Sequence, residues 1–191
     1  MIIINNPSSS SNLPNGTLIN GVCHIYQSSL PTTRPDGSAL VARDKWYNTS
    51  TGVEGFWNGT YWLTNQILAA SVPVGNVGTT QSVLAADLLV PSGNIFVLDH
   101  IVHGTEAVAP QNLTDYWDFS FSVRQVFGES LLTGTISGAS ISGMSTSGYR
   151  VTSIINQYVA GVNLIDFSFK RVASAGSLRR MNQSLRFREV L

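Results

Sequence analysis

Two carboxylates flank a tryptophan in the second half of the chain, in the order Asp115, Trp117, Asp118. Enzymes that cleave glycosidic bonds hold two carboxyl groups about 5–10 Å apart in a cleft. An aromatic ring beside such a pair gives a sugar a stacking platform, so the pattern predicts a polysaccharide-cleaving site as one alternative. Such enzymes generally need a longer, grooved scaffold, and we therefore do not favour this alternative.

The densest group of candidate metal ligands is Asp99, His100 and His103. Side chains alternate along a β-strand, so positions 100 and 103 point to opposite faces and only one of them contributes to a shared coordination shell. We therefore expect no metal site here, and we interpret the two histidines as a pair on an edge strand.

Motifs for nucleophilic or phosphate chemistry are also missing from the sequence. No G-x-S-x-G stands between a strand and a helix, and no Gly-rich loop precedes Lys-Ser or Lys-Thr. The single cysteine, Cys23, has only the adjacent His24 for company, and it has no partner for an internal disulfide. We therefore expect no catalytic residues, no cofactor and no enzymatic activity.

Aromatic residues are concentrated in the stretch KWYNTSTGVEGFWNGTYWL, from Lys45 to Leu63, which holds three of the four tryptophans. The turn signals Thr49-Ser50-Thr51-Gly52 and Asn58-Gly59 divide it into three short strands, which predicts an antiparallel meander. Alternation lets one aromatic per strand share a face. Because so small a sheet has few other sources of burial, we predict that the tryptophans are mainly structural, with at most one ring exposed.

Some aromatic rings remain candidates for stacking on a neutral sugar. Tyr and Trp suit this role because each combines an apolar body with a polar tip. The candidate binding residues are Tyr47, Trp57 and Tyr61 in the meander, and Tyr116 and Trp117 at the entry to a later strand.

The composition indicates an uncharged polar surface. Hydrophobic residues make up 43% of the chain and charged residues 12%, about half of the roughly 25% charge of an ordinary soluble domain. Low charge weakens the repulsion that keeps monomers apart, so we expect an oligomer or an assembly component. No apolar run approaches the roughly 20 residues of a membrane span, and we expect no membrane insertion.

Positive charge is concentrated at the C-terminus. Residues 170–191 carry Lys170, Arg171, Arg179, Arg180, Arg186 and Arg188 against Glu189 alone, whereas residues 67–169 are mainly acidic. A basic terminus is one signature of nucleic-acid binding. We favour the alternative that these arginines pair with the acidic middle of the same chain or of a neighbour, because arginine forks match carboxylates well. We therefore expect no nucleic-acid partner.

Three segments are expected along the chain. Residues 1–30 are expected to form an N-terminal arm and attachment segment. Residues 1–20 hold a Ser run, Pro7 and Pro14, which predicts an extended arm that orders on a partner, and the following GVCHIYQSSL predicts a short strand. Residues 31–66 hold the Trp-rich meander. Residues 67–191 alternate clearly, as in Asp118–Val123 and Asp166–Phe169, which predicts an antiparallel β-sandwich of jelly-roll-like type. Only residues 80–90 have any helical character, so the expected fold class is all-β.

Two stretches resemble proteins of bacteriophage particles. The segment PTTRPDGSALVARDKWYNTSTGVEGFWNGTYWL resembles a short Trp-rich module of tail fibres and other virion proteins, particularly in phages of cyanobacteria. Arg43 stands where that module usually has Gly before its Asp. The stretches NLTDYWDFSFSVRQ and SFKRVASAGSLRRMNQSLRFREVL are similar to β-sandwich heads of phage fibres and capsid-associated proteins.

The resemblance implies a non-enzymatic virion protein that forms a homotrimer and presents sandwich heads. Its expected roles are a tail fibre or receptor-binding protein that contacts a host surface glycan, or a capsid decoration (cement) protein. The N-terminal arm would then bind other virion proteins. A tail-associated polysaccharide depolymerase is the enzymatic alternative.

Overall fold

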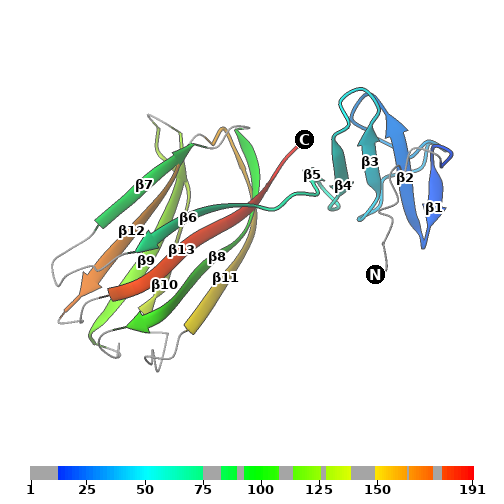
Figure 1. The fold of residues 1–191 in the computed structure, drawn as a ribbon. Coiled ribbons are helices and arrows are strands. Elements are labelled where there is room, and N and C mark those ends of the chain that lie inside the picture. Colours follow the sequence, from blue (N-terminus) through cyan, green and yellow to red (C-terminus); the bar gives the residue numbers. More distant parts are fainter. Residues whose placement is uncertain are drawn as a thin grey trace, which may run out of the picture. The chain divides into compact units, whose positions relative to one another are not determined.

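The computed structural model describes residues 13–74, 83–89, 93–107, 114–125, 128–138, 149–162, 164–173 and 178–191. Within these ranges the regular elements are β-strands (Figure 1). The expected all-β class is therefore confirmed. In these same ranges no helix has the length and hydrophobicity of a membrane span. The chain divides into two compact units. The first runs to Gln66 and also includes Val190 and Leu191, and the second spans Ile67–Glu189.

The first unit is a five-stranded sheet in sequence order. Its strands are β1 (Thr17–Ile19), β2 (Val22–Gln27), β3 (Lys45–Asn48), β4 (Glu54–Trp57) and β5 (Trp62–Thr64). Neighbours are antiparallel except β2 and β3, which run parallel. Val190 forms an isolated bridge with Leu63, and the amide of Leu191 donates to the carbonyl of Trp62 at 3.0 Å. The last two residues therefore extend the sheet beyond β5.

This sheet corrects two expectations. The three strands expected between Lys45 and Leu63 are present as β3, β4 and β5, but β1 and β2 extend the meander to five strands with one parallel pair. Residues 17–19, expected within the extended arm, lie inside the sheet as β1, whereas the short strand expected after the arm is confirmed as β2. Residues 1–12 fall outside the described ranges. Parallel pairing needs a long crossover between strands, which residues 28–44 supply.

A buried carboxylate organises that crossover. Asp44 is 1% exposed and accepts two hydrogen bonds of 2.8 Å from the Arg34 guanidinium. It also accepts from the amide of Val41 at 2.9 Å and from the amide of Cys23 at 3.1 Å. Burial alone would raise the pKa of Asp44, but these hydrogen bonds outweigh burial and hold it below its ordinary value. One side chain thus ties the crossover loop to β2.

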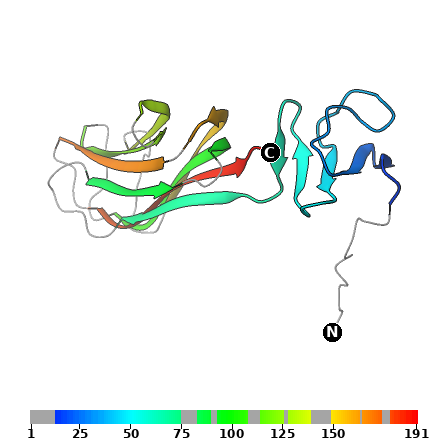
Figure 2. The same ribbon diagram turned by 90° about the horizontal axis from the view of Figure 1, so that it is seen from above.

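The second unit, called the head below, is a sandwich of two four-stranded antiparallel sheets. Their strands are β6 (Leu68–Val74), β7 (Val83–Leu89), β8 (Asn94–Ala107), β9 (Tyr116–Arg124), β10 (Ser130–Ser137), β11 (Tyr149–Ala160), β12 (Leu164–Val172) and β13 (Leu178–Glu189). One sheet has the order β11-β8-β13-β6 and the other β10-β9-β12-β7. Figures 1 and 2 show these sheets as facing layers. Successive strands largely alternate between the sheets, which is the jelly-roll arrangement and confirms the expected sandwich.

The core of the head is the apolar space between the two sheets. Inward-facing residues from both layers form it, including Trp117, Phe119, Phe121 and Val123 of β9, Ile165, Phe167 and Phe169 of β12, and Met181, Leu185 and Phe187 of β13. Along β9 buried and half-buried residues alternate without a break. The alternation that the sequence shows at Asp118–Val123 therefore corresponds to an inner face of rings and an outer face of polar side chains.

Two local expectations for the head differ from the structure. Residues 83–89, in the stretch with helical character, form the edge strand β7, which pairs with β12. The strand that carries His100 is β8, which lies between β11 and β13 and is not an edge strand. Both differences arise because pairing with distant segments decides whether a stretch becomes a strand and which strands lie beside it.

Candidate functional site

The tryptophan cluster of the first unit has a structural role. Trp46 and Trp62 are 5% and 3% exposed, and Trp57 is half-buried. Trp62 is the cross-strand partner of Trp57, with ring centroids 5.7 Å apart, and its ring lies 6.2 Å from that of Trp46. The indole nitrogens of Trp46 and Trp62 donate to the carbonyls of Gln27 and Pro31. The prediction of buried tryptophans with at most one exposed ring is confirmed.

Gly55 makes room for this cluster. It lies opposite Trp46 in the register, and a Cβ there would come within 2.6 Å of the Leu191 side chain and 3.0 Å of the Leu63 carbonyl oxygen. The missing side chain lets Leu191 pack on the cluster together with Leu40. The tryptophans, Gly55 and the end of the chain thus form one core.

The predicted binding residues of the module do not form one surface. Tyr47 and Trp57 lie on opposite faces of the sheet, because Tyr47 is adjacent to Trp46, which shares a face with Trp57. Tyr47 instead contacts Tyr26 of β2, with ring centroids 6.2 Å apart. Tyr61 is half-buried beside the turn at Asn58. Sequence reasoning missed Tyr26 because the parallel pairing of β2 with β3 leaves no local signal.

At the entry to β9 the two predicted residues separate. Trp117 is 0% exposed and belongs to the core between the sheets, so its assignment to a binding surface is wrong. Tyr116 is half-buried and faces outward, as do Asp118 and Ser120 farther along the strand. The Trp117 indole is therefore not exposed beside Asp115 and Asp118 in the way that the sugar-cleaving alternative expected.

The outer face of the sheet β10-β9-β12-β7 carries a dense group of hydroxyls, which we call the hydroxyl face. Its members are Ser120 and Ser122 of β9, Ser130, Thr133 and Thr135 of β10, and Ser168 of β12. They line a shallow hollow of about 530 Å³. Ser120 and Thr135 share a hydrogen bond of 2.8 Å, and Ser122 and Ser130 share one of 2.7 Å. Sequence reasoning noted the alternating serines of β9 but could not place β10 beside them.

An ion pair lies in the same hollow. Arg124 of β9 donates from Nε to Asp166 of β12, and both residues line the space. The side chains are 26% and 8% exposed. The pair places hydrogen-bonding groups of opposite charge beside neutral hydroxyls.

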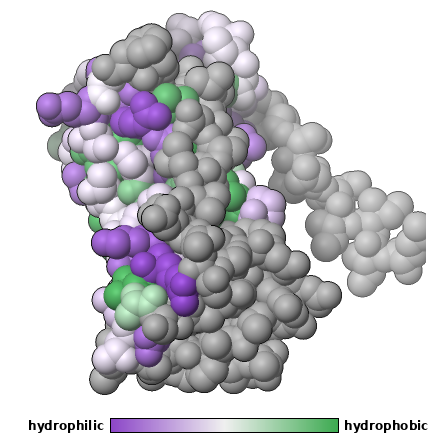
Figure 3. Space-filling model, turned by 90° about the vertical axis from the view of Figure 1, so that its left-hand side faces the viewer, coloured by the Kyte–Doolittle hydropathy of each residue, from purple (hydrophilic) through white to green (hydrophobic). Residues whose placement is uncertain are grey.

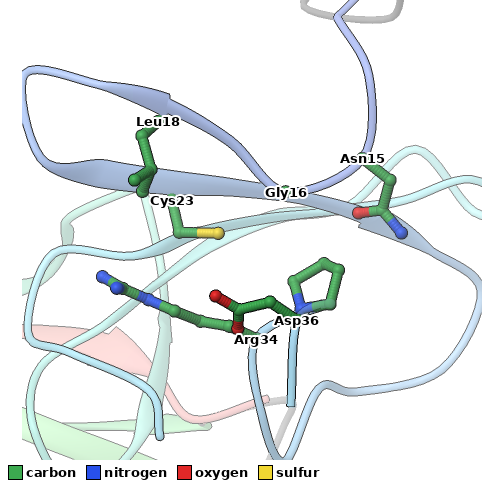
Figure 4. A pocket seen from close by; sticks show the side chains of 7 residues that line it. Asn15, Gly16, Leu18, Cys23, Arg34 and Asp36 are labelled. Carbon is green, nitrogen blue, oxygen red and sulfur yellow. The ribbon is translucent and has the colours of Figure 1, made fainter. Parts of the chain in front are cut away.

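A smaller pocket of about 280 Å³ lies in the first unit between the β1–β2 hairpin and the crossover loop (Figure 4). Cys23, Arg34 and Asp36 are among its lining residues. Burial, followed by the nearby Asp44 charge, raises the pKa of the Cys23 thiol, so the thiolate that a nucleophile needs is disfavoured. The Arg34 guanidinium is already held by Asp44. The Asp36 carboxylate accepts from the amide and the hydroxyl of Ser38. The arrangement therefore does not suit nucleophilic chemistry.

The two histidines of β8 lie in different environments. His100 is fully buried, and its Nε2 accepts a hydrogen bond of 2.8 Å from Nε2 of Gln183, which also donates to the carbonyl of Ser120 at 2.7 Å. Burial lowers the pKa of His100 to about 4, although the Asp99 charge acts in the opposite direction. His103 is exposed. Among the described residues no group of three His, Cys, Asp or Glu is arranged to hold a metal ion.

Pairing between the basic C-terminus and the acidic middle is seen directly. Arg186 of β13 donates from Nε to Oδ1 of Asp99 at 2.8 Å, and its Nη2 donates to the other carboxylate oxygen. Asp99 is 3% exposed. The favoured interpretation of these arginines is therefore confirmed for this pair.

No family model matches the sequence, and no curated protein matches it significantly. Solved structures that the chain matches in part include the infectious bursal disease virus VP2 subviral particle, at 11% identity and a TM-score of 0.42, covering 85% of this chain and 41% of that one. The T13 particle of the same virus gives 10% identity, a TM-score of 0.39 and coverage of 85% and 39%.

A third solved structure is that of Bacillus endospore appendages, described as disulfide-linked pili. It gives 13% identity and a TM-score of 0.30, covering 71% of this chain and 94% of that one. The chain spans less than half the length of the VP2 chains. With TM-scores below 0.5, these matches support no conclusion about the fold or the role of this chain.

Proposed function

We propose that the chain is a non-enzymatic structural protein of a virion, oligomeric in the particle, whose head contacts the surface of the host cell. The observation that carries the proposal is the outer face of the sheet β10-β9-β12-β7, which presents hydroxyls around one ion pair in an open hollow. Each hydroxyl both donates and accepts hydrogen bonds, so such a surface suits recognition of another polar, uncharged surface. Jelly rolls also occur in viral capsid and lectin domains, which supports the proposal by analogy of fold.

The resemblance to phage modules supports a more specific role as a tail fibre or receptor-binding protein. In that role the protein is a homotrimer, and its N-terminal segment attaches it to other virion proteins. The low charge content of 12% supports self-association, because little electrostatic repulsion opposes it. The absence of an exposed indole beside Asp115 and Asp118 supports a binding role over a depolymerase.

Two measurements test this function. Light scattering of the purified chain at micromolar concentration is expected to show an oligomer, and a monomer would count against the proposal. Labelled protein is expected to bind intact host cells. Binding to expanded capsid shells and not to cells would instead assign it to capsid decoration, and release of reducing sugar from host polysaccharide would assign it to the depolymerases.

A further inference from the structure

We propose that the hydroxyl face of the head is the receptor site and that its ligand is a neutral, polyhydroxylated glycan. This inference rests on the receptor-binding function proposed above and adds the site and the chemical class of the ligand. The hollow of about 530 Å³ lies within the range of about 300–1,000 Å³ that is typical of ligand sites.

The hydrogen-bonding capacity of the face matches that of a sugar. Each Ser or Thr hydroxyl offers one donor and two acceptor positions. The pairs Ser120–Thr135 and Ser122–Ser130 each share one hydrogen bond, which leaves every pair with a further donor and several acceptor positions. A ligand whose own hydroxyls both donate and accept can satisfy such a surface, whereas a ligand that only accepts cannot.

The charge of the hollow favours a neutral ligand. Its ionic lining residues are Arg124 and Asp166, and they form an ion pair with each other. An anionic sugar would meet the carboxylate of Asp166 and would have to compete with it for the guanidinium. A neutral ligand leaves the pair intact, and the Arg124 side chain, at 26% exposure the more accessible partner, can donate to a sugar hydroxyl in a charge-assisted hydrogen bond.

The face is also rigidly supported. β9 and β12 are the interior strands of their sheet, and the residues on their inner faces, such as Phe119 and Phe167, are fully buried. Side chains fixed on packed strands lose little freedom when a ligand binds, which reduces the entropic cost of binding. Tyr116, on the same outer face of β9, lies toward the other end of the strand from Arg124.

Binding of the full-length chain to a panel of immobilised oligosaccharides tests this proposal. The panel contains neutral hexose, deoxyhexose and N-acetylhexosamine oligomers, with uronic acid and sulfated oligomers for comparison. The variants Thr135→Val and Ser122→Ala each remove one hydroxyl of the face with little change in volume. Ser71→Ala is the matched control, because Ser71 lies in the other sheet and its hydroxyl donates to Asn182 at 2.8 Å.

We expect the wild type to bind at least one neutral oligomer, with an affinity that is nearly constant between 50 and 500 mM salt because no net charge is involved. Thr135→Val and Ser122→Ala should each weaken binding by about threefold to tenfold, and both together by more. Ser71→Ala should bind as the wild type does. Melting temperatures of all variants should stay close to that of the wild type, because the substituted side chains lie on the sheet surface.

Each failure has a distinct meaning. If the wild type binds host cells but both face variants bind equally well, the hydroxyl face is not the receptor site and the receptor function stands. If only acidic oligomers bind, with strong salt dependence, the neutral class is wrong. If cells are bound and no oligomer is, the ligand is not a glycan. If neither cells nor oligomers are bound, the receptor function fails as well.

Discussion

Acidification should destabilise the head through His100. The ring is fully buried and neutral, because its Nε2 accepts from Gln183 and burial lowers its pKa from 6.5 to about 4. In the unfolded chain the same group takes up a proton near pH 6.5. The stabilising effect of the neutral ring is therefore complete above pH 6.5 and is lost as the pH falls toward 4.

The size of this effect follows from the two pKa values. Between pH 7.5 and 5 the unfolded chain gains most of a proton at this site and the folded head gains almost none, which lowers the free energy of unfolding by about 2 kcal/mol. By pH 4 the free energy of unfolding has fallen by about 3 kcal/mol through this group. The variant His100→Gln keeps an acceptor for Gln183 but does not titrate, so its stability should lack this component.

Amide hydrogen exchange in peptides from β8 and β13 measures the opening free energy of the head separately from that of the first unit. Wild type, His100→Gln and the exposed-site control His103→Gln are compared at equal pH, so intrinsic exchange rates and the titration of carboxylates cancel. The difference between wild type and His100→Gln should change by about 2 kcal/mol between pH 7.5 and 5, while His103→Gln follows the wild type. Parallel pH profiles for all three proteins would refute the buried, neutral histidine.

Three further predictions concern the first unit. Trp46→Ala should lower the free energy of unfolding of the first unit by about 3–5 kcal/mol, enough to unfold it, whereas the same change at half-buried Trp57 should lower it by less. Thermal unfolding followed by tryptophan fluorescence measures both variants, and equal losses would contradict the burial of the cluster. Gly55→Ala should destabilise by about 1–3 kcal/mol because its Cβ meets Leu191, and Leu191→Ala in the same chain should recover part of the loss in urea titrations. Arg43 has φ of +84°, so Arg43→Gly should stabilise by up to about 1 kcal/mol, and a lower urea midpoint would refute backbone strain there.

Local chemistry in the sequence determined much of the fold. Alternation of Phe with Ser at residues 118–123 predicts a half-buried strand because side chains of a strand point alternately to its two faces, and the structure shows this pattern in β9. The turn signal Asn58-Gly59 places a reversal between β4 and β5, where Gly59 has φ of +109°. Arg43, directly before Asp44, has a left-handed backbone conformation with φ of +84°, which usually favours glycine. These features depend only on residues that are neighbours along the chain, so the sequence alone predicts them.

The tertiary structure alone decided which strands are neighbours, and with that which surfaces exist. Trp117 and Tyr116 are adjacent in sequence, yet one fills the core and the other faces outward, because the facing sheet selects the buried side. Joining of β2 to β3 in parallel brought Tyr26 to Tyr47 across the long crossover that Asp44 holds. The hydroxyl face likewise requires β9, β10 and β12 to pair side by side. Such pairings depend on the burial of apolar faces contributed by distant segments, and no local pattern specifies them.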